Sequence, residues 1–401
     1  MEAPSKACWF GSVRVQSFRS YPECHIDLNP GVSVLIGANG AGKTNFLEAL
    51  SLFAPGKGLR KAAAADLPHR PHTPTKLAAV PDGAALPVQQ TASGSWAVSA
   101  QLKTPLGQHQ MGTGLELSKG ERRVLRVDGT TLRGQSSLPA YVSILWLTPR
   151  MDGIFVGAVS ERRGFLDQLV MALDPGHASE LAAYLYAMRE RGRLLKHAKA
   201  SNQSADPTWL SSLEDSMVRH GLAIAAARRS YCRQLAPIFS VGQKPFPGGS
   251  CSLDGSLERA LDQEKSLVLE DRFRKDLENA RGRDRDLGRA TLGPHTTDLL
   301  VWNADHGRIA ADCSTGEQKA LLVALLLAHG RLMSQDQSRL PIFLLDEVAA
   351  HFDEARRSAL FEALVDMGAQ AILTGTDRRA FEALEGKGSF IQVAAQSLSY
   401  V

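Results

Sequence analysis

The stretch that decides the fold is VLIGANGAGKTNFLEAL, residues 34–50, in which branched apolar residues give way to glycines, a lysine and a helical pattern. Its centre fits GxxxxGK[ST], the pattern of a phosphate-binding loop. In such a loop, glycines let backbone N–H groups turn toward phosphate oxygens, a lysine adds a cation, and a hydroxyl can bind Mg²⁺. The predicted phosphate-binding residues are Gly37, Ala38, Asn39, Gly40, Ala41, Gly42, Lys43 and Thr44. The loop alone leaves open whether the phosphate drives solute movement, small-molecule chemistry or binding of a larger partner.

The composition permits several architectures and excludes few functions. A chain of 401 residues that is 44% hydrophobic can form two or three compact units, or one fold with a large insertion. A formal charge of +4 is too small to indicate nucleic acid by itself. The five cysteines show neither zinc-ligand nor disulfide-framework spacing. The most apolar run, residues 320–330, is too short to span a bilayer, so a cytoplasmic protein without membrane partners is expected.

The pattern of apolar residues divides the chain into three parts. Alternating residues before and after the loop predict strands, including ones at 95–102, 122–129 and 140–149, in a part ending near 155. An Ala- and Pro-rich excursion at 55–94 is expected to lie on the surface. Residues 156–288 follow a helical period, interrupted by the turn-rich FPGGSCSLDGS, and are predicted to form an inserted helical lobe. Residues 289–401 return to strands and helices.

An apolar strand that ends in two acids, IFLLDE at residues 342–347, suits the second half of an ATPase site. Asp346 would hold Mg²⁺, since that ion prefers oxygen ligands, and Glu347 would polarise the attacking water. We predict that Glu347 and Lys43 are the catalytic residues. The alternative is that the acidic pair is only a helix N-cap.

A third motif, CSTGEQKALL at residues 313–322, reads as the capped start of a helix. Ser314 and Thr315 are suited to capping, and Gly316 allows close approach, so this helix start is a candidate anion site. An ordinary capped helix explains the local sequence equally well. Its position ahead of the acidic strand is what gives it meaning.

Together these motifs resemble the ATP-binding-cassette heads of the SMC and RecF group, and the RecF-type proteins most closely. The resemblance rests on GANGAGKTN, STGEQ and LLDE followed by VAAHFDEARR. It extends to VRVQSFRSY, NFLEALSLFAPGKGLR, TPRMDGIFVGAVSERRGFLDQLV and LGPHTTDLL, and so covers most of the chain. Lys43 and Asp346 are too far apart for a transporter ATPase subunit and too close for SMC arms, and sustained heptads are lacking.

The resemblance implies an α/β fold: an ABC-type P-loop ATPase head with a β-rich N-terminal part and an inserted, mainly helical lobe. It implies ATP and Mg²⁺ as cofactors, and ATP held between two protomers. The loop of one protomer would then face the signature of the other, with Asp353 near the interface. That signature comprises Ser314, Gly316, Glu317 and Gln318. The glutamine that cassette ATPases carry after the middle strand is not evident here, and Asp152 is its candidate substitute. The histidine usual after the last strand is replaced by Thr374, Gly375 and Thr376. Slow turnover is therefore expected.

The implied function is ATP-dependent binding of gapped or junction DNA as a homodimer. Such a dimer would act with recombination mediator proteins to load recombinase in repair and replication restart, and would support the SOS response. Two alternatives remain: an ATPase subunit of an ABC transporter, and an adaptor that binds nucleotide without hydrolysing it.

Basic residues in the helical block are the candidates for DNA contact, because such runs can neutralise backbone phosphates. They are Arg189, Arg191, Arg193, Lys196, Lys199, Arg228, Arg229 and Arg233. A solvated helix face is about as good an explanation of the charge. Arg162, Arg163, Pro294 and His295 also belong to RecF-like segments, and we expect them to brace the two lobes.

Overall fold

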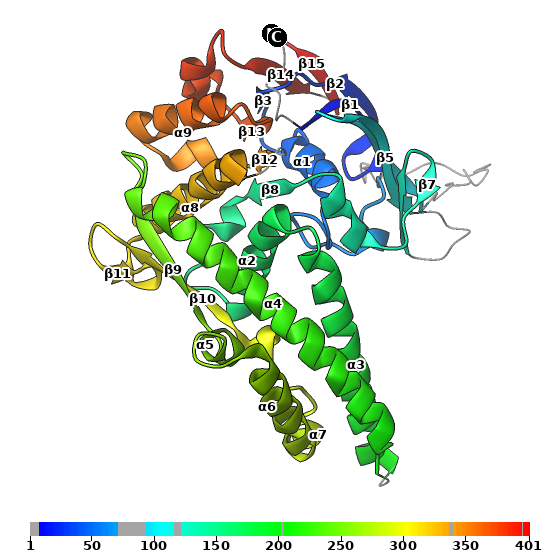
Figure 1. The fold of residues 1–401 in the computed structure, drawn as a ribbon. Coiled ribbons are helices and arrows are strands. Elements are labelled where there is room, and N and C mark those ends of the chain that lie inside the picture. Colours follow the sequence, from blue (N-terminus) through cyan, green and yellow to red (C-terminus); the bar gives the residue numbers. More distant parts are fainter. Residues whose placement is uncertain (1–7, 71–93, 116–121, 202–203, 337–339, 395) are drawn as a thin grey trace, which may run out of the picture.

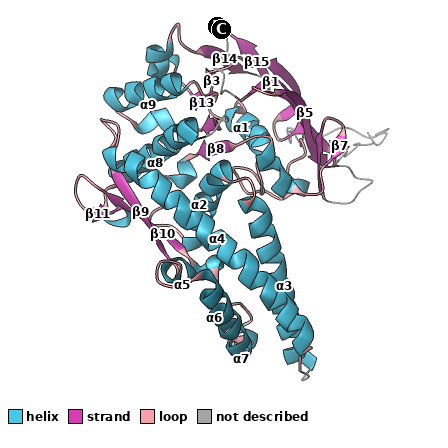
Figure 2. Ribbon diagram, viewed as in Figure 1, coloured by secondary structure: helices cyan, strands magenta, loops and turns pink. Residues whose placement is uncertain are grey.

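The computed structural model describes residues 8–70, 94–115, 122–201, 204–336, 340–394 and 396–401. Two six-stranded sheets lie at one end of the molecule, and long helices extend away from them (Figures 1 and 2). This is the expected mixed α/β head with a helical insertion. Among the described residues, none of the helices combines the length and the apolar character needed to cross a membrane.

The central sheet carries the phosphate loop. Its strands, in spatial order, are β15 (Ser397–Tyr400), β14 (Ser389–Ala394), β3 (Val32–Ile36), β13 (Ala371–Gly375), β12 (Ile342–Leu345) and β8 (Ile144–Leu147). All neighbours pair in parallel except β14 and β15. All residues of β3, β12 and β13 are buried, which is typical of parallel strands covered on both faces. The predicted strand at IFLLDE is thereby confirmed.

An antiparallel sheet packs against the central one. Its strands, in order, are β2 (Tyr21–Asp27), β1 (Trp9–Phe18), β4 (Trp96–Thr104), β5 (Gly107–Leu115), β6 (Arg123–Val127) and β7 (Thr130–Thr131). The sequence predicted β4 and β6 but missed β5, whose Gly- and Gln-rich sequence has weak strand propensity. β5 forms because it pairs with β4 along its whole length.

The helices fall into a head set and a lobe set. They are α1 (Lys43–Ser51), α2 (Val159–Leu173), α3 (His177–Ser201), α4 (Pro207–Val241), α5 (Ser256–Ala260), α6 (Ser266–Asn279), α7 (Arg281–Leu287), α8 (Thr315–Asp336) and α9 (Glu354–Met367). Short 3₁₀ turns lie at Ala64–Asp66, Gln135–Ala140, Pro149–Met151, Pro294–Thr296, Ala310–Asp312, Val348–His351 and Arg378–Leu384. Figure 1 shows α3, α4 and α6 running together away from the sheets.

One part of the predicted helical lobe is a strand instead. The stretch read as turn-rich contains β9 (Gly249–Asp254), which pairs with β10 (Asp298–Asn303) in a small sheet completed by β11 (Arg308–Ile309). The prediction of a turn was wrong because β9 owes its strand state to β10, which lies far along the chain.

The region after α1 has both buried and exposed residues. Within the described residues 55–70, the side chains of Leu59 and Leu67 are buried, and Pro68 bridges to Phe18. These two leucines anchor the segment to the head, while Lys57, Lys61 and Asp66 of the same segment are exposed. A 3₁₀ turn forms at Ala64–Asp66. The remainder of the excursion, 71–93, lies outside the described residues.

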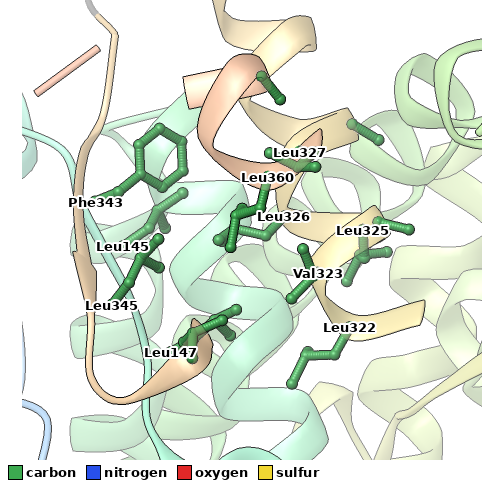
Figure 3. Close-up of a cluster of buried hydrophobic side chains, with 14 of the residues drawn as sticks. Leu145, Leu147, Leu322, Val323, Leu325, Leu326, Leu327, Phe343, Leu345 and Leu360 are labelled. Carbon is green, nitrogen blue, oxygen red and sulfur yellow. The ribbon is translucent and has the colours of Figure 1, made fainter. Parts of the chain in front are cut away.

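Buried apolar clusters cover both faces of the central sheet. Figure 3 shows leucines of α8 meeting Leu145, Phe343 and Leu345 of the sheet, with Leu360 of α9 alongside. The opposite face packs on α1 and on the antiparallel sheet. Each fully buried side chain of this size contributes roughly 1.5–3 kcal/mol. A separate cluster within α3, α4 and α6 holds the lobe together.

Ion pairs fasten the lobe to the head, as expected for bracing residues. The Arg162 guanidinium donates to both carboxylate oxygens of Asp298 at 2.7 and 2.8 Å, and Arg163 donates to the Thr297 carbonyl. His295 Nδ1 lies 2.7 Å from the Tyr184 hydroxyl. The largest buried cluster runs through α2, α4 and the head alike. The domain boundaries at 155 and 288 therefore stay a prediction.

The buried His329 of α8 generates a test of the fold. Its Nδ1 lies 3.2 Å from the Tyr231 hydroxyl, its Nε2 has no hydrogen-bond partner in the described part of the chain, and burial lowers its pKa to about 3. Between pH 6.5 and 3 the unfolded chain therefore binds a proton that the folded chain does not, so acid destabilises the fold. His329→Gln should lose about 2 kcal/mol less unfolding free energy than the parent between pH 7 and pH 5. Urea unfolding at the two pH values measures this, and equal losses would contradict it.

Candidate functional site

The phosphate loop connects the buried strand β3 to α1. Gly40 and Gly42 have φ values of +83° and +110°, which side chains with a Cβ rarely adopt. A Cβ on Gly42 would also lie 2.8 Å from both the Ser20 and Tyr21 hydroxyl oxygens. These glycines let the loop curl over the start of α1, where unpaired N–H groups and the helix dipole favour an anion.

Lys43 lies over this loop. Its Nζ donates to the carbonyls of Gly37 at 2.7 Å and Ala38 at 3.0 Å. Burial lowers the pKa of Lys43, and the carboxylates of Glu347 and Asp346 act in the opposite direction. The ammonium is thus held at the loop by weak carbonyl partners, for which phosphate oxygens can substitute.

The acidic strand end lies directly beside the loop. The Thr44 hydroxyl is 2.9 and 3.0 Å from the two carboxylate oxygens of Asp346. The Thr374 hydroxyl donates to Asp346 Oδ1 at 2.9 Å and accepts from the Glu347 backbone N–H at the same distance. Thr374 therefore orients both acids, a role that the sequence did not reveal.

Glu347 has a left-handed backbone, with φ of +53°. A residue other than glycine in this region carries a cost of order 1–3 kcal/mol, and such strain is often found at functional positions. The turn directs the chain from β12 into the 3₁₀ turn and then to Asp353, whose carboxylate caps α9 by accepting from the Arg356 N–H. Asp353 is exposed.

A hollow with a volume of about 670 Å³ adjoins the loop. It is lined by Gly40, Ala41 and Asn45 from the loop and α1, and by Arg19, Ser20, His69 and Arg70 from other segments. The sequence signal was present in the segment FRSY, but no role had been assigned to it.

The hydrogen bonds that the described structure gives the signature, at the start of α8, join residues that are close together in the sequence. Ser314 donates to Glu317 Oε2 from both its backbone N–H and its hydroxyl, and its hydroxyl accepts from the Glu317 N–H, which is a capping box. These bonds lower the pKa of Glu317. Gln318 donates to the Cys313 carbonyl at 2.9 Å. Ser314, Thr315 and Gly316 are exposed, and a Cβ on Gly316 would meet open space.

Within the described chain, none of the signature's hydrogen bonds reaches the phosphate loop. The structure therefore brings together Lys43, Thr44, Asp346 and Glu347, and leaves Ser314 and Gly316 facing solvent elsewhere.

The next residue of that helix, Lys319, joins three segments. Its buried ammonium lies 3.4 Å from Asp152 Oδ2 and 5.5 Å from the centre of the Phe352 ring. Phe352 directly precedes Asp353. Asp152, considered as a stand-in for the glutamine of related sites, is thus paired with Lys319.

The site suits a magnesium nucleotide by its donor set. A carboxylate and a hydroxyl close together offer the hard oxygen ligands that Mg²⁺ prefers, and phosphate oxygens and water complete its shell. The described residues contain no group of three or more His, Cys, Asp or Glu side chains placed to bind a metal without such help.

Several of the predicted DNA-binding arginines are engaged elsewhere. Arg191 is buried between Glu214 and Asp284, at 2.8 and 2.6 Å. Arg228 is buried against both oxygens of Asp167, at 2.8 and 2.9 Å. The prediction of DNA contact was wrong for these two, because a buried, paired guanidinium cannot reach a phosphate.

The remaining candidates differ in their freedom. Arg229 and Arg233 are both paired with Asp262. Arg193 pairs with Glu190 and is exposed. Exposed side chains also include Arg189, Lys196 and Lys199 of α3.

The chain is similar to known proteins along most of its length. A family model described as the RecF/RecN/SMC N terminal domain matches residues 10–397. The chain is 42% identical to the DNA replication and repair protein RecF of Mesorhizobium japonicum over 381 residues, covering 94% of each chain. It is 41% identical to the RecF of Brucella suis over 390 residues, covering 96% of this chain and 95% of that one.

A solved structure of "the recombination mediator protein RecF-ATP in RecFOR pathway" has the same fold. It superposes with a TM-score of 0.80 at 18% identity, covering 98% of each chain. The chain belongs to the RecF proteins of the RecF/RecN/SMC family.

Proposed function

We propose that this chain is a cytoplasmic, ATP-dependent DNA-binding protein of recombinational repair and replication restart. Its relatives are named DNA replication and repair proteins, and a solved structure of its fold is described as a recombination mediator with ATP. In this role it helps to load recombinase on gapped or junction DNA, acts with recombination mediator proteins and supports the SOS response. The alternative of a transporter ATPase subunit finds no support in these relatives.

The observation that carries the proposal is the phosphate loop beside the acidic strand end. The loop N–H groups and Lys43 bind the phosphates, while Thr44 and Asp346 hold Mg²⁺. A Mg²⁺ ion held by these two residues would supply positive charge against the charge that develops on the phosphates. Glu347 orients and polarises a water, and Thr374 keeps the acid pair in place. The hollow lined by Arg19, Asn45 and His69 takes the base and ribose.

The separation of loop and signature supports an ATP-dependent homodimer. Each chain carries a loop with its acids and, on another surface, an exposed Ser314 and Gly316. The signature of one protomer contacts the nucleotide on the other, with Gln318 and Glu317 shaping its helix start. ATP then stabilises the dimer by binding both surfaces, and its hydrolysis releases them. Turnover is slow, DNA-stimulated and serves as a timer.

Lys43→Ala should lower ATP affinity by about a hundredfold, because the variant loses a charge-assisted contact to phosphate. Fluorescence anisotropy with a labelled ATP analogue and Mg²⁺ measures the effect. Lys275→Ala, which removes an exposed lysine of α6, is the matched control and should bind as the parent does. Unchanged affinity in Lys43→Ala would refute the assignment of the loop.

Glu347→Gln should bind ATP and accumulate as a dimer, because it keeps the volume of the side chain and removes the base that polarises water. Sedimentation velocity with and without ATP follows the association. Single-turnover hydrolysis distinguishes the adaptor alternative, in which the parent also leaves ATP intact. A variant that stays monomeric at saturating ATP would sink the dimer mechanism.

DNA binding by the exposed face of α3 predicts a specific salt effect. Arg189→Gln with Lys196→Gln should weaken binding to gapped duplex DNA and reduce the slope of log affinity against log salt by about 2. Arg274→Gln serves as the control, because Arg274 is already paired with Asp215 and Asp271. Affinity that is independent of salt would exclude backbone contacts as the basis of binding.

A further inference from the structure

A mostly apolar cavity of about 280 Å³ lies outside the nucleotide site. Its walls come from the segment after α1, from β8 and the turn that follows it, and from α2. The side chains of Leu59, Ile144, Ile154 and Phe165 line it and are buried. Such a space suits one large apolar side chain.

The rim of the cavity is basic. Lys57, Lys61 and Arg150 line it, are exposed, and make no ion pair or side-chain hydrogen bond with the described part of the chain. Glu161 is the only carboxylate among the described lining residues. Three unpaired cations around an apolar hollow produce a local positive potential that the weakly charged chain as a whole does not have.

A half-buried guanidinium, bonded to Gly56 of the cavity lining, adds to this potential. Arg123 Nη1 donates to the Gly56 carbonyl at 3.0 Å, whereas its Nε and Nη2 are buried and have no hydrogen-bond partner among the described residues. Burial lowers the pKa of Arg123 to about 10, so it is still protonated at neutral pH. A buried cation without a carboxylate is costly, and an approaching anion reduces that cost.

The backbone of the segment that carries Lys57 and Lys61 is held in place before any partner arrives. The Leu59 N–H donates to the Ser51 hydroxyl at 2.9 Å, and the Gly56 N–H donates to Gln135 Oε1 at 2.8 Å. Arg60 donates to Asn45 Oδ1 at 2.7 Å and to Glu48 at 3.2 Å, which anchors the segment to α1. Little conformational entropy of this backbone is therefore lost when a ligand binds here.

We propose that this cavity is a docking site for a short acidic peptide segment of a partner protein. One large apolar side chain of the segment enters between Leu59 and Phe165, and its flanking carboxylates pair with Lys57, Lys61 and Arg150. A nucleobase fits less well, because the buried apolar wall would leave its donors and acceptors unpaired. The proposal does not rest on the proposed nucleotide function.

Binding of designed peptides to the full-length protein tests the proposal. The probe is a fluorescein-labelled peptide of Asp and Glu around a single Phe, measured by fluorescence anisotropy at physiological salt. Replacing its Phe with Ala should weaken binding by about tenfold or more, the effect of burying one large side chain. Saturable binding with this difference is the expected result.

Variants of the protein locate the site. Gly164 lies on α2 at the cavity and a Cβ there would meet open space, so Gly164→Leu fills the cavity without a clash. The variant should bind the Phe peptide with about tenfold lower affinity. Thermal unfolding followed by circular dichroism checks that the variant is folded. Lys57→Glu with Arg150→Glu should weaken binding in the same way, whereas Lys275→Glu on α6 should not.

Three outcomes would overturn the proposal. The first is equal binding of the Phe and Ala peptides, or no saturable binding of either. The second is unchanged peptide binding in Gly164→Leu and in the charge-reversed variant. The third is a loss of single-stranded DNA binding, with no loss of peptide binding, in Gly164→Leu, which keeps every charge of the rim; the cavity would then be a nucleic-acid pocket.

Discussion

The hydrogen bond between the Thr44 hydroxyl and the Asp346 carboxylate joins positions 302 residues apart, and the whole head is arranged around it. β3 and β12 both pair in parallel with β13, so their carboxyl ends meet at the same edge of the sheet. α1 begins at that edge, and Asp346 and Glu347 directly follow β12 there. The helical lobe is inserted after β8, which pairs with β12 on the side away from β13. The insertion lengthens the chain between Thr44 and Asp346 without disturbing their contact.

The elements of the head could be predicted because their chemistry is local. Glycines at positive φ, an adjacent lysine and threonine, and an apolar run that ends in Asp346 each specify their own conformation. Parallel pairing of buried strands then leaves one sheet edge where they can meet. The left-handed turn at Glu347 and the bonds of Thr374 could not be foreseen, since they depend on strands that are adjacent only in the fold.

Charge was the least reliable guide, because the number of basic residues does not show what they pair with. Arg191 finds Glu214 and Asp284 from two other helices, and Arg228 finds Asp167. β9 shows the same limit for secondary structure, since β10 determines its state. The hollow beside the loop and the cavity at α2 are assembled from separate segments, so local patterns carry little trace of them.

Glu48 of α1 connects these two spaces through one fully buried carboxylate. It accepts from Arg19, which lines the hollow beside the phosphate loop, and from Arg60, which lines the cavity near α2. A ligand that draws Arg60 toward the cavity leaves Glu48 to Arg19 alone and so alters the electrostatic field at the other hollow. Thermodynamic linkage makes such an effect reciprocal: whatever factor one ligand imposes on the affinity of the other, it receives in return. A single buried glutamate thus holds one arginine from the lining of each space.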